Sequence, residues 1–190
     1  MTGRIFTADH HVYDLPPLLS WNVRHTGTVP CDSWSVTAVY QPEMLTVLRM
    51  AAGFAAIENG MTQLRGIVDE YTVELGSRGM TVTLSGRGYA ARLLDNESRP
   101  VTYEQVTLRE LIRCHAEPYG ISCGAAADLR STVPYTAGVG ISQWKVISEF
   151  CRTYGGFLPR FAKTGELLAT PEQDSGKRIK IGRASCRERV

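Results

Sequence analysis

The stretch MTVTLSGRGYAARLLDNE, residues 80–97, decides the fold because the hydrophobic period changes within it. Its first part, MTVTLSG, alternates apolar residues with small polar ones, which is the period-two pattern of a half-buried strand. Its second part places Ala90, Leu93 and Leu94 on one helical face. A short helix therefore follows a strand directly, and we predict a domain boundary near residue 88.

Before this boundary the sequence predicts strands joined by tight turns. SWSVTAVY, residues 33–40, alternates in the same way. Asn59-Gly60 separates two strand-like runs and is a strong hairpin signal, because both positions tolerate positive φ. Gly76 and Gly79 flank a second turn. This pattern predicts an antiparallel, barrel-like β-domain over residues 1–88, whether complete or incomplete in itself. Residues 42–50 fit either a strand or a short helix.

After the boundary the sequence predicts a small α+β domain over residues 89–172. Thr107 and Glu110 have the spacing of a capping box, in which each side chain binds the other residue's backbone amide. Pro118 and Gly120 end that helix, and a short strand is expected near ISCG, residues 121–124. The first half of the domain therefore reads as a helix followed by a strand.

The second half of this domain reads as a helix followed by a hairpin. Ser142 is the expected N-cap, and Gly155 with Gly156 ends the helix. An apolar stripe at helical spacing runs between them, formed by Ile147, Phe150, Cys151 and Tyr154. A hairpin is expected around residues 163–165. The whole chain is thus predicted to be an α+β protein, with a barrel-like β-domain and a helix-strand-helix-hairpin domain.

The last ten residues, IGRASCRERV, differ from the rest of the chain in composition and hydrophobic pattern. They match the translation of a common short-read sequencing adapter. We therefore interpret residues 181–190 as an artefactual tail that is not part of the fold. Residues 173–180 are then expected to begin a further β-domain that is missing here.

Composition narrows the classes of function. Without the tail, 18 basic and 18 acidic side chains remain, and a balanced charge gives no basic footprint for nucleic acid. No apolar run approaches the roughly 20 residues that span a bilayer, so no membrane insertion is expected. The remaining cysteines lack a C-x-x-C pair and fit a reducing compartment; they are Cys31, Cys114, Cys123 and Cys151.

The histidine and glycine motifs do not match a known pattern of active-site residues. His10 and His11 are adjacent and cannot converge on one metal from a strand, and two further ligands at a suitable spacing are missing. Cys114 and His115 are neighbours on a helix and diverge by about 100°, so His115 is expected in a core or an interface. SGRG, residues 85–88, lacks the lysine and the glycine spacing of a phosphate-binding loop.

Carboxylate pairs are equally uninformative. Glu104 with Glu110, or Glu172 with Asp174, could be proposed as the two acids of a glycosidase, but any chain rich in acids offers such pairs. We therefore predict no catalytic residue, no cofactor and no metal, and a protein that is not an enzyme.

Several pieces in a fixed order carry a resemblance to a known family. They are a strand ending in S-G-R, a short helix bearing L-L-D, a helix before P-Y-G-I, and a G-x-S-x-W helix that leads into a hairpin. This order, over residues 60–170, resembles the tail hub proteins of contractile-tailed bacteriophages, a family that includes the late control D proteins and the Mu-type baseplate hub. Residues 1–58 match only as generic barrel strands.

The resemblance implies a structural component of the virion tail, assembled in the host cytoplasm. Such a hub is a homotrimer that connects the tail tube protein to the spike protein. Within that picture, Gly86 and Gly88 are predicted to allow a sharp exit from strand to helix, and Trp144 and Phe157 to anchor the α+β domain on the barrel.

Two hypotheses from other classes of function stay open. Tail hubs are sometimes fused to wall-degrading domains, which would make the protein a peptidoglycan hydrolase. Residues 104–170 are also loosely similar to the LysM fold, which would make them a peptidoglycan-binding module.

Overall fold

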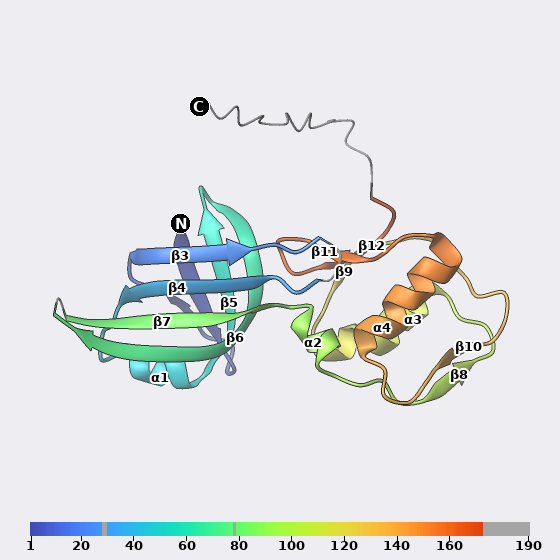
Figure 1. The fold of residues 1–190 in the computed structure, drawn as a ribbon, viewed down its shortest axis with the longest axis horizontal. Helices are drawn as coiled ribbons and strands as arrows, with labels where there is room; N and C mark the ends of the chain where they lie inside the picture. The colour runs from blue at the N-terminus through green and yellow to red at the C-terminus, as the bar shows by residue number, and fades with distance from the viewer. Residues whose placement is uncertain (28–29, 78, 173–190) are drawn as a thin grey trace, which may run out of the picture.

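The computed structural model describes residues 1–27, 30–77 and 79–172, and it shows two bodies side by side (Figure 1). The first is a rolled antiparallel sheet with one short helix. Its elements are β1 (Thr2–Thr7), β2 (Val12–Asp14), β3 (Leu18–Arg24), β4 (Ser33–Val39), α1 (Met44–Arg49), β5 (Ala51–Glu58), β6 (Met61–Gly76) and β7 (Gly79–Gly88).

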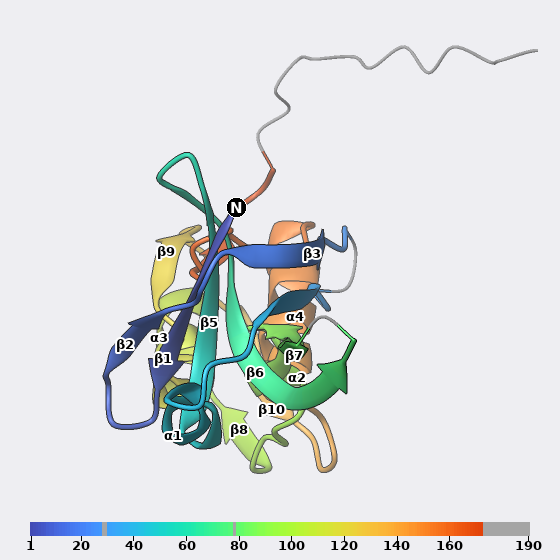
Figure 2. The same cartoon turned by 90° about the vertical axis from the view of Figure 1, so that its left-hand side faces the viewer.

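The sheet is open rather than closed into a barrel. Its strand order is β2-β1-β5-β6-β7-β4-β3, so the two edge strands are consecutive in the sequence and joined by Leu15, Pro16 and Pro17. Because proline has no backbone N–H to donate, this link cannot continue the hydrogen-bond ladder between the edges. Figure 2 shows the sheet curling around its core. The predicted barrel-like domain is therefore corrected to an open, rolled sheet.

Aromatic stacking and small residues fill the interior of the sheet. The Trp34 ring stacks on Phe54 with centroids 3.8 Å apart, and its Nε1 donates to the backbone oxygen of Ile67 at 3.1 Å. Residues 42–50, which fitted either class, form the helix α1, and Met44 and Leu48 bury its apolar face. This core contains only residues of the first body.

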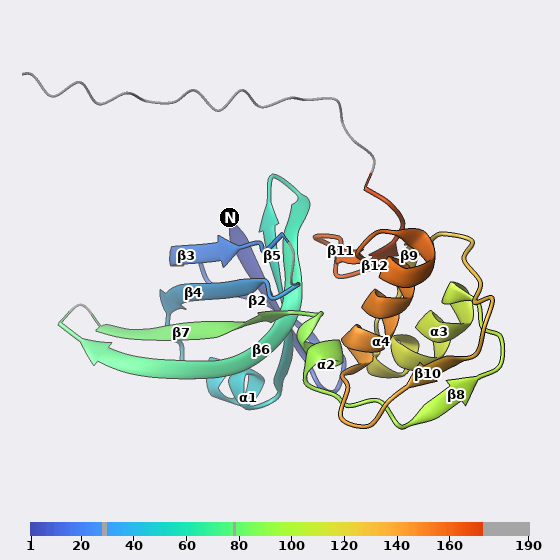
Figure 3. The same ribbon diagram turned by 45° about the vertical axis from the view of Figure 1, so that its right-hand side comes forward.

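The hairpin of β6 and β7 extends beyond the rest of the sheet, as Figures 1 and 3 show. Strand β5 pairs with β6 only as far as Ile67, whereas β6 continues along β7 to Gly76 after a register shift between Val68 and Glu70. The close crossing requires glycine at residue 66, where a Cβ atom would lie 2.1 Å from the backbone oxygen of Arg87. The turn before β6 is the predicted one, with φ of 51° at Asn59 and 76° at Gly60.

The second body is a small α+β domain around its own core (Figure 3). Helices α3 and α4 pack together beside a mixed three-stranded sheet and a two-stranded antiparallel one. Its elements are α2 (Ala91–Leu94), β8 (Val101–Tyr103), α3 (Leu108–His115), η1 (Glu117–Tyr119), β9 (Cys123–Ala126), β10 (Tyr135–Ala137), α4 (Gln143–Phe150), η2 (Cys151–Gly155), β11 (Arg160–Phe161) and β12 (Leu167–Ala169).

Local sequence signals account for the limits of both long helices. Thr107 and Glu110 form the predicted capping box at the start of α3, and the Ser142 hydroxyl accepts the Lys145 amide at the start of α4. Helix α4 runs on into a π-helical turn, η2, that ends at Gly156 with φ of 69°. No helix among the described residues is long and apolar enough to cross a membrane.

Candidate functional site

The joint between the two bodies is built around Arg87 at the end of β7. Its guanidinium binds both oxygens of Asp69 on β6, at 2.8 and 3.0 Å, and reaches Asp95 at the end of α2, at 2.9 and 3.1 Å. The hydrogen bonds to Asp69 and then to Asp95 raise the pKa of Arg87. Because one planar fork bridges carboxylates from both bodies, it fixes the direction in which α2 leaves the sheet.

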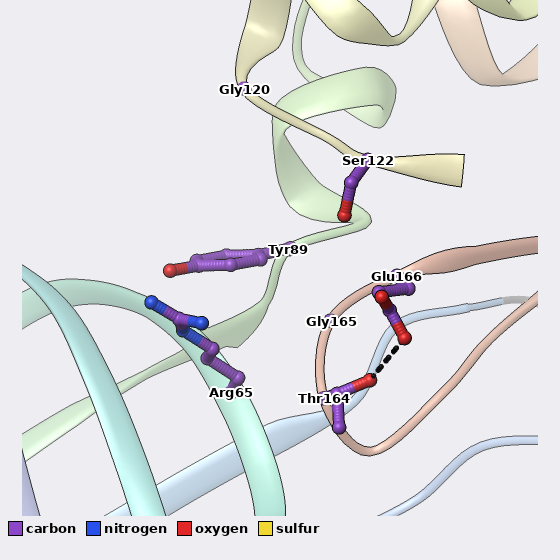
Figure 4. A pocket seen from close by; sticks show the side chains of 7 residues that line it. All are labelled: Arg65, Tyr89, Gly120, Ser122, Thr164, Gly165 and Glu166. Carbon is purple, nitrogen blue, oxygen red and sulfur yellow. Dashed lines mark hydrogen bonds between the residues drawn. The ribbon is translucent and has the colours of Figure 1, made fainter. Parts of the chain in front are cut away.

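A second part of the joint surrounds Tyr89, as Figure 4 shows. The Arg65 guanidinium lies 4.8 Å from the Phe6 ring centre and 5.9 Å from that of Tyr89. Arg92 lies 4.8 Å from the Tyr89 ring centre and donates to the backbone oxygen of Tyr119 at 3.0 Å. The Tyr89 ring is therefore within cation–π distance of two guanidinium groups, one from each body.

The hairpin of β11 and β12 closes this joint from the second body. Gly165 has φ of 85°, and a Cβ atom there would lie 2.6 Å from the Tyr89 ring. Next to it, Lys163 Nζ donates to Gln63 Oε1 of β6 at 2.7 Å. Only glycine lets the turn approach the ring this closely.

The hollow left at the joint is polar and offers no reactive pair. It has a volume of about 220 Å³ and lies between Arg65 of the sheet and Ser122, Thr164 and Glu166 of the second domain. The Glu166 carboxylate accepts the Thr164 hydroxyl at 3.0 Å. Among the hydrogen bonds of the described residues, none joins Ser122 to a base that could activate it. The hollow is thus a polar gap at the joint between the two bodies.

His115 lies in the interior, as predicted, and is fully hydrogen-bonded. It is 5% exposed, and its Nδ1 lies 2.5 Å from the amide oxygen of Gln143, to which it must donate. Its Nε2 then accepts the Tyr103 hydroxyl at 3.0 Å. Gln143 in turn donates to the Glu97 backbone oxygen and to the Tyr119 hydroxyl, both at 2.9 Å. This network lines a hollow of about 660 Å³ and stabilises the domain.

The other sequence candidates are not brought together. His10 lies in the turn between β1 and β2 with φ of 67°, and His11 contacts Asp9 at 3.0 Å. Cys114 is exposed whereas its neighbour His115 is buried. Within residues 1–27, 30–77 and 79–172, no group of three His, Cys, Asp or Glu side chains could hold a metal ion.

The acidic residues considered as catalytic candidates lie in different environments. Glu110 is engaged in the capping box, where the Thr107 amide and hydroxyl lower the pKa of its carboxyl. Glu104 and Glu172 are exposed. The partner proposed for Glu172, Asp174, lies outside the described residues, as do residues 173–180 and 181–190.

Two roles predicted from the resemblance are corrected. Trp144 and Phe157 pack in the core of the second domain, which contains no residue of the sheet; the anchor is instead the joint around Arg87 and Tyr89. Gly86 is needed for close approach, because a Cβ atom there would lie 2.0 Å from the Ile67 oxygen. Neither Gly86 nor Gly88 has positive φ, and β7 continues to Gly88.

Sequence reasoning did not identify which strands form the free edges of the sheet. Among the described residues, strand β3 pairs with β4 on one side only, and the outer part of β6 pairs with β7 only. Large apolar side chains lie exposed on both edges: Leu19 at 59%, Trp21 at 51% and Leu75 at 81%. The sequence LLSWNVR, which has no lysine or proline within the strand, was the signal that could have found the first edge.

Comparison with known proteins identifies the fold. No protein-family model matches the chain, and no curated protein sequence matches it. The solved structures that match include the tail protein from Neisseria meningitidis MC58, with TM-score 0.66 and 14% identity over 87% of this chain. They also include the 43 kDa tail protein of prophage MuSo2 from Shewanella oneidensis, with TM-score 0.67 and 15% identity over 89%.

This chain spans about half the length of the two matched proteins, namely 50% and 54%. Both are tail proteins, and one is encoded by a prophage. The described residues therefore have the fold of phage tail proteins, as the sequence resemblance predicted.

Proposed function

We propose that the protein is a structural subunit of a phage-type tail baseplate hub, of the late control D kind, which connects the tail tube to the spike. The observation that supports this most is the shared fold with two tail proteins over nearly the whole described chain. The homotrimer, the tube and spike partners and the location in the virion tail belong to this proposal. So does the division into domains at residue 88, which agrees with the two separate cores.

The free sheet edges support a role in assembly. Exposed strands with apolar side chains are a liability in an isolated protein, and natural proteins cover or pair them. A subunit of a symmetric assembly does so through its neighbours. The described residues also keep their buried polar side chains hydrogen-bonded, as a stable core requires. These features favour a structural protein over an enzyme.

The mass of the complete gene product tests the proposal. The reading frame would be recovered across its 3′ end, and the full-length protein examined by light scattering and for binding to the tube protein encoded beside it. We expect a trimer that binds the tube protein. A monomer that does not bind it would contradict the hub function.

Purified cell walls test the two alternatives. A structural hub neither releases sugar or peptide fragments from peptidoglycan nor is retained on it. Release of fragments would identify a hydrolase, and retention without release would identify a wall-binding module.

A further inference from the structure

A second hollow at the joint between the two bodies has a cationic wall. It has a volume of about 420 Å³, and Arg65 lines it from the sheet while Arg92 and Gly120 line it from the second domain. His10 and Tyr89 also line it, and none of the described residues around it is an aspartate or a glutamate. A concave surface lined by charge of one sign attracts ions of the other sign. We call it the arginine hollow, and its electrostatics favour an anion.

Arg65 reaches this hollow from β6 without an acidic partner. Its guanidinium contacts two aromatic rings, at 4.8 Å from the Phe6 ring centre and 5.9 Å from that of Tyr89. Among the described residues, the exposed Arg65 side chain forms no hydrogen bond and no ion pair. A guanidinium group has five N–H donors in a planar fork. All five can therefore serve a ligand.

The acidic residue of the neighbouring hollow does not neutralise Arg65. Figure 4 shows the Glu166 carboxylate turned toward Thr164, from whose hydroxyl it accepts a hydrogen bond at 3.0 Å. Within the described parts of the chain, no ion pair joins Glu166 to Arg65 or Arg92. The two guanidinium groups of the arginine hollow thus have no carboxylate partner among the described residues.

Arg92 and Tyr89 add hydrogen-bond donors from the other side of the hollow. One N–H of Arg92 donates to the Tyr119 backbone oxygen at 3.0 Å and holds the side chain in place, which leaves its other donors for a ligand. The Tyr89 hydroxyl forms no hydrogen bond among the described residues. It lies close to Gly53, where a Cβ atom would be 3.5 Å from the hydroxyl oxygen. Two guanidinium groups and one hydroxyl therefore offer donors to the same hollow.

The rest of the lining favours a carboxylate that is carried by a polypeptide over a bare ion. Phe6, Ala8, Ala52 and Gly53 present apolar or backbone surface, against which the methylene groups of an acidic side chain can pack. The planar fork of an arginine matches the two oxygens of a carboxylate. Clustered arginines are also a recurring means of binding acidic peptide motifs.

We propose that the arginine hollow binds an aspartate or glutamate side chain from an acidic segment of a partner polypeptide. The carboxylate accepts hydrogen bonds from Arg65, from Arg92 and from the Tyr89 hydroxyl. Because Arg65 belongs to the sheet and Arg92 to the second domain, the bound carboxylate also bridges the two bodies. The inference goes beyond the proposed function and does not rest on it.

Titration with an acidic peptide tests the site. The full chain would be followed by heteronuclear NMR, at fixed ionic strength, as a capped peptide of alternating glutamate and alanine is added. The matched control peptide has glutamine in place of glutamate. We expect the glutamate peptide to shift the backbone amide signals of Gly53 and Gly120 and the side-chain signals of the two arginines. Equal shifts with both peptides, or shifts confined to the basic residues 181–190, would overturn the proposal.

Substitution of the arginines provides an independent test. Arg65→Gln should weaken binding of the glutamate peptide by about tenfold or more, with an unchanged circular dichroism spectrum because the side chain is exposed. Arg92→Gln should act in the same direction. Arg49→Gln is the matched control, since it removes the same charge from an exposed position on α1 outside the hollow. Equal weakening by Arg49→Gln and Arg65→Gln would show that net charge, rather than this hollow, binds the peptide, and would overturn the proposal.

Other anions test the choice of ligand. Inorganic phosphate and a thymidine oligonucleotide would be titrated under the same conditions, and both should bind the hollow more weakly than the glutamate peptide does. Tighter binding of phosphate would identify a site for a free ion, and tighter binding of the oligonucleotide would identify a nucleic-acid site. Either result would overturn the assignment to a polypeptide carboxylate.

The two proposals can fail separately. A full-length trimer that binds the tube protein, but whose arginine hollow does not respond to the glutamate peptide, would remove the carboxylate site and keep the hub function. A monomer that binds the peptide in the arginine hollow, and does not bind the tube protein, would do the reverse.

Discussion

The two bodies of the chain use their apolar side chains differently. In the second domain the exposed apolar residues lie singly in loops, as Val133, Val139 and Leu158 do, and such isolated residues are ordinary. In the sheet, Trp21 and Leu75 lie on strand edges whose backbone groups also lack a neighbouring strand. The second domain therefore buries most of its apolar side chains in its own core, whereas the sheet leaves apolar side chains exposed on its edge strands.

Removal of a central aromatic from the second domain should have the largest effect. Phe150 is fully buried and contacts Tyr135 and Tyr154, so Phe150→Ala should lower the free energy of unfolding by about 3–5 kcal/mol. Hydrogen exchange measured by mass spectrometry should show lost protection over residues 108–155. Equal loss over β4 and β7 would show instead that the two bodies unfold as one unit.

Local signals predicted turns and helix starts better than strand pairing. The capping box at Thr107, the cap at Ser142 and the turn at Asn59-Gly60 depend on residues close in sequence, and all three are present. The free edges depend on which distant strands pair. Nothing local shows that β5 leaves β6 at Ile67, or that β3 ends the sheet.

The same limit explains the errors about single residues. Trp144 and Phe157 were predicted to anchor the second domain on the sheet, but their partners come from their own domain. Gly86 was expected to serve a turn, whereas it serves a crossing with Ile67, which is 19 positions away. The joint at Arg87 was missed because Asp69 and Asp95 become its neighbours only after β6 and α2 have formed.

Alkaline pH should destabilise the second domain next most strongly. Burial raises the pKa of Cys151 from 9.0 to about 12, and burial followed by the nearby Glu149 raises the pKa of Tyr135 from 10.0 to about 12. A raised folded pKa gives stability that is complete below the unfolded value and is lost as pH rises toward the folded one. The free energy of unfolding should thus fall between about pH 9 and 12.

Urea titrations across this pH range measure the effect. Cys151→Ala removes one of the two groups, so its unfolding free energy should depend less steeply on pH than that of the parent. Cys114→Ser is the control, since the Cys114 side chain is exposed. An identical slope in all three proteins would show that Cys151 does not contribute to the alkaline limit.

Disruption of the His115 network should lower the free energy of unfolding by an intermediate amount. His115→Ala leaves the Gln143 amide oxygen and the Tyr103 hydroxyl without their present partner, which should cost about 1–3 kcal/mol. The adjacent Cys114→Ser should change the unfolding free energy by less than about 0.5 kcal/mol. Similar losses in both variants would mean that the helix position, rather than the network, determines the cost.

Loss of the α3 cap should have a smaller effect on the free energy of unfolding. Thr107→Ala removes the hydroxyl that accepts the Glu110 amide and should lower the unfolding free energy by about 1 kcal/mol. Thr107→Ser keeps the hydroxyl and should restore most of it. If serine were no better than alanine, packing of the threonine methyl group and not the cap would explain the loss.

The smallest effect on stability is expected at Trp21, although tryptophan is the largest side chain. Trp21→Ser removes a ring that is already half exposed, so the unfolding free energy of the dilute chain should change by less than about 0.5 kcal/mol. The same substitution should weaken self-association, because the Trp21 indole is expected to contact a second copy. A loss above about 2 kcal/mol in the dilute chain would place Trp21 in the core of its own sheet. The two bodies would then differ in strand number and helix content, but no longer in whether they are complete without a neighbour.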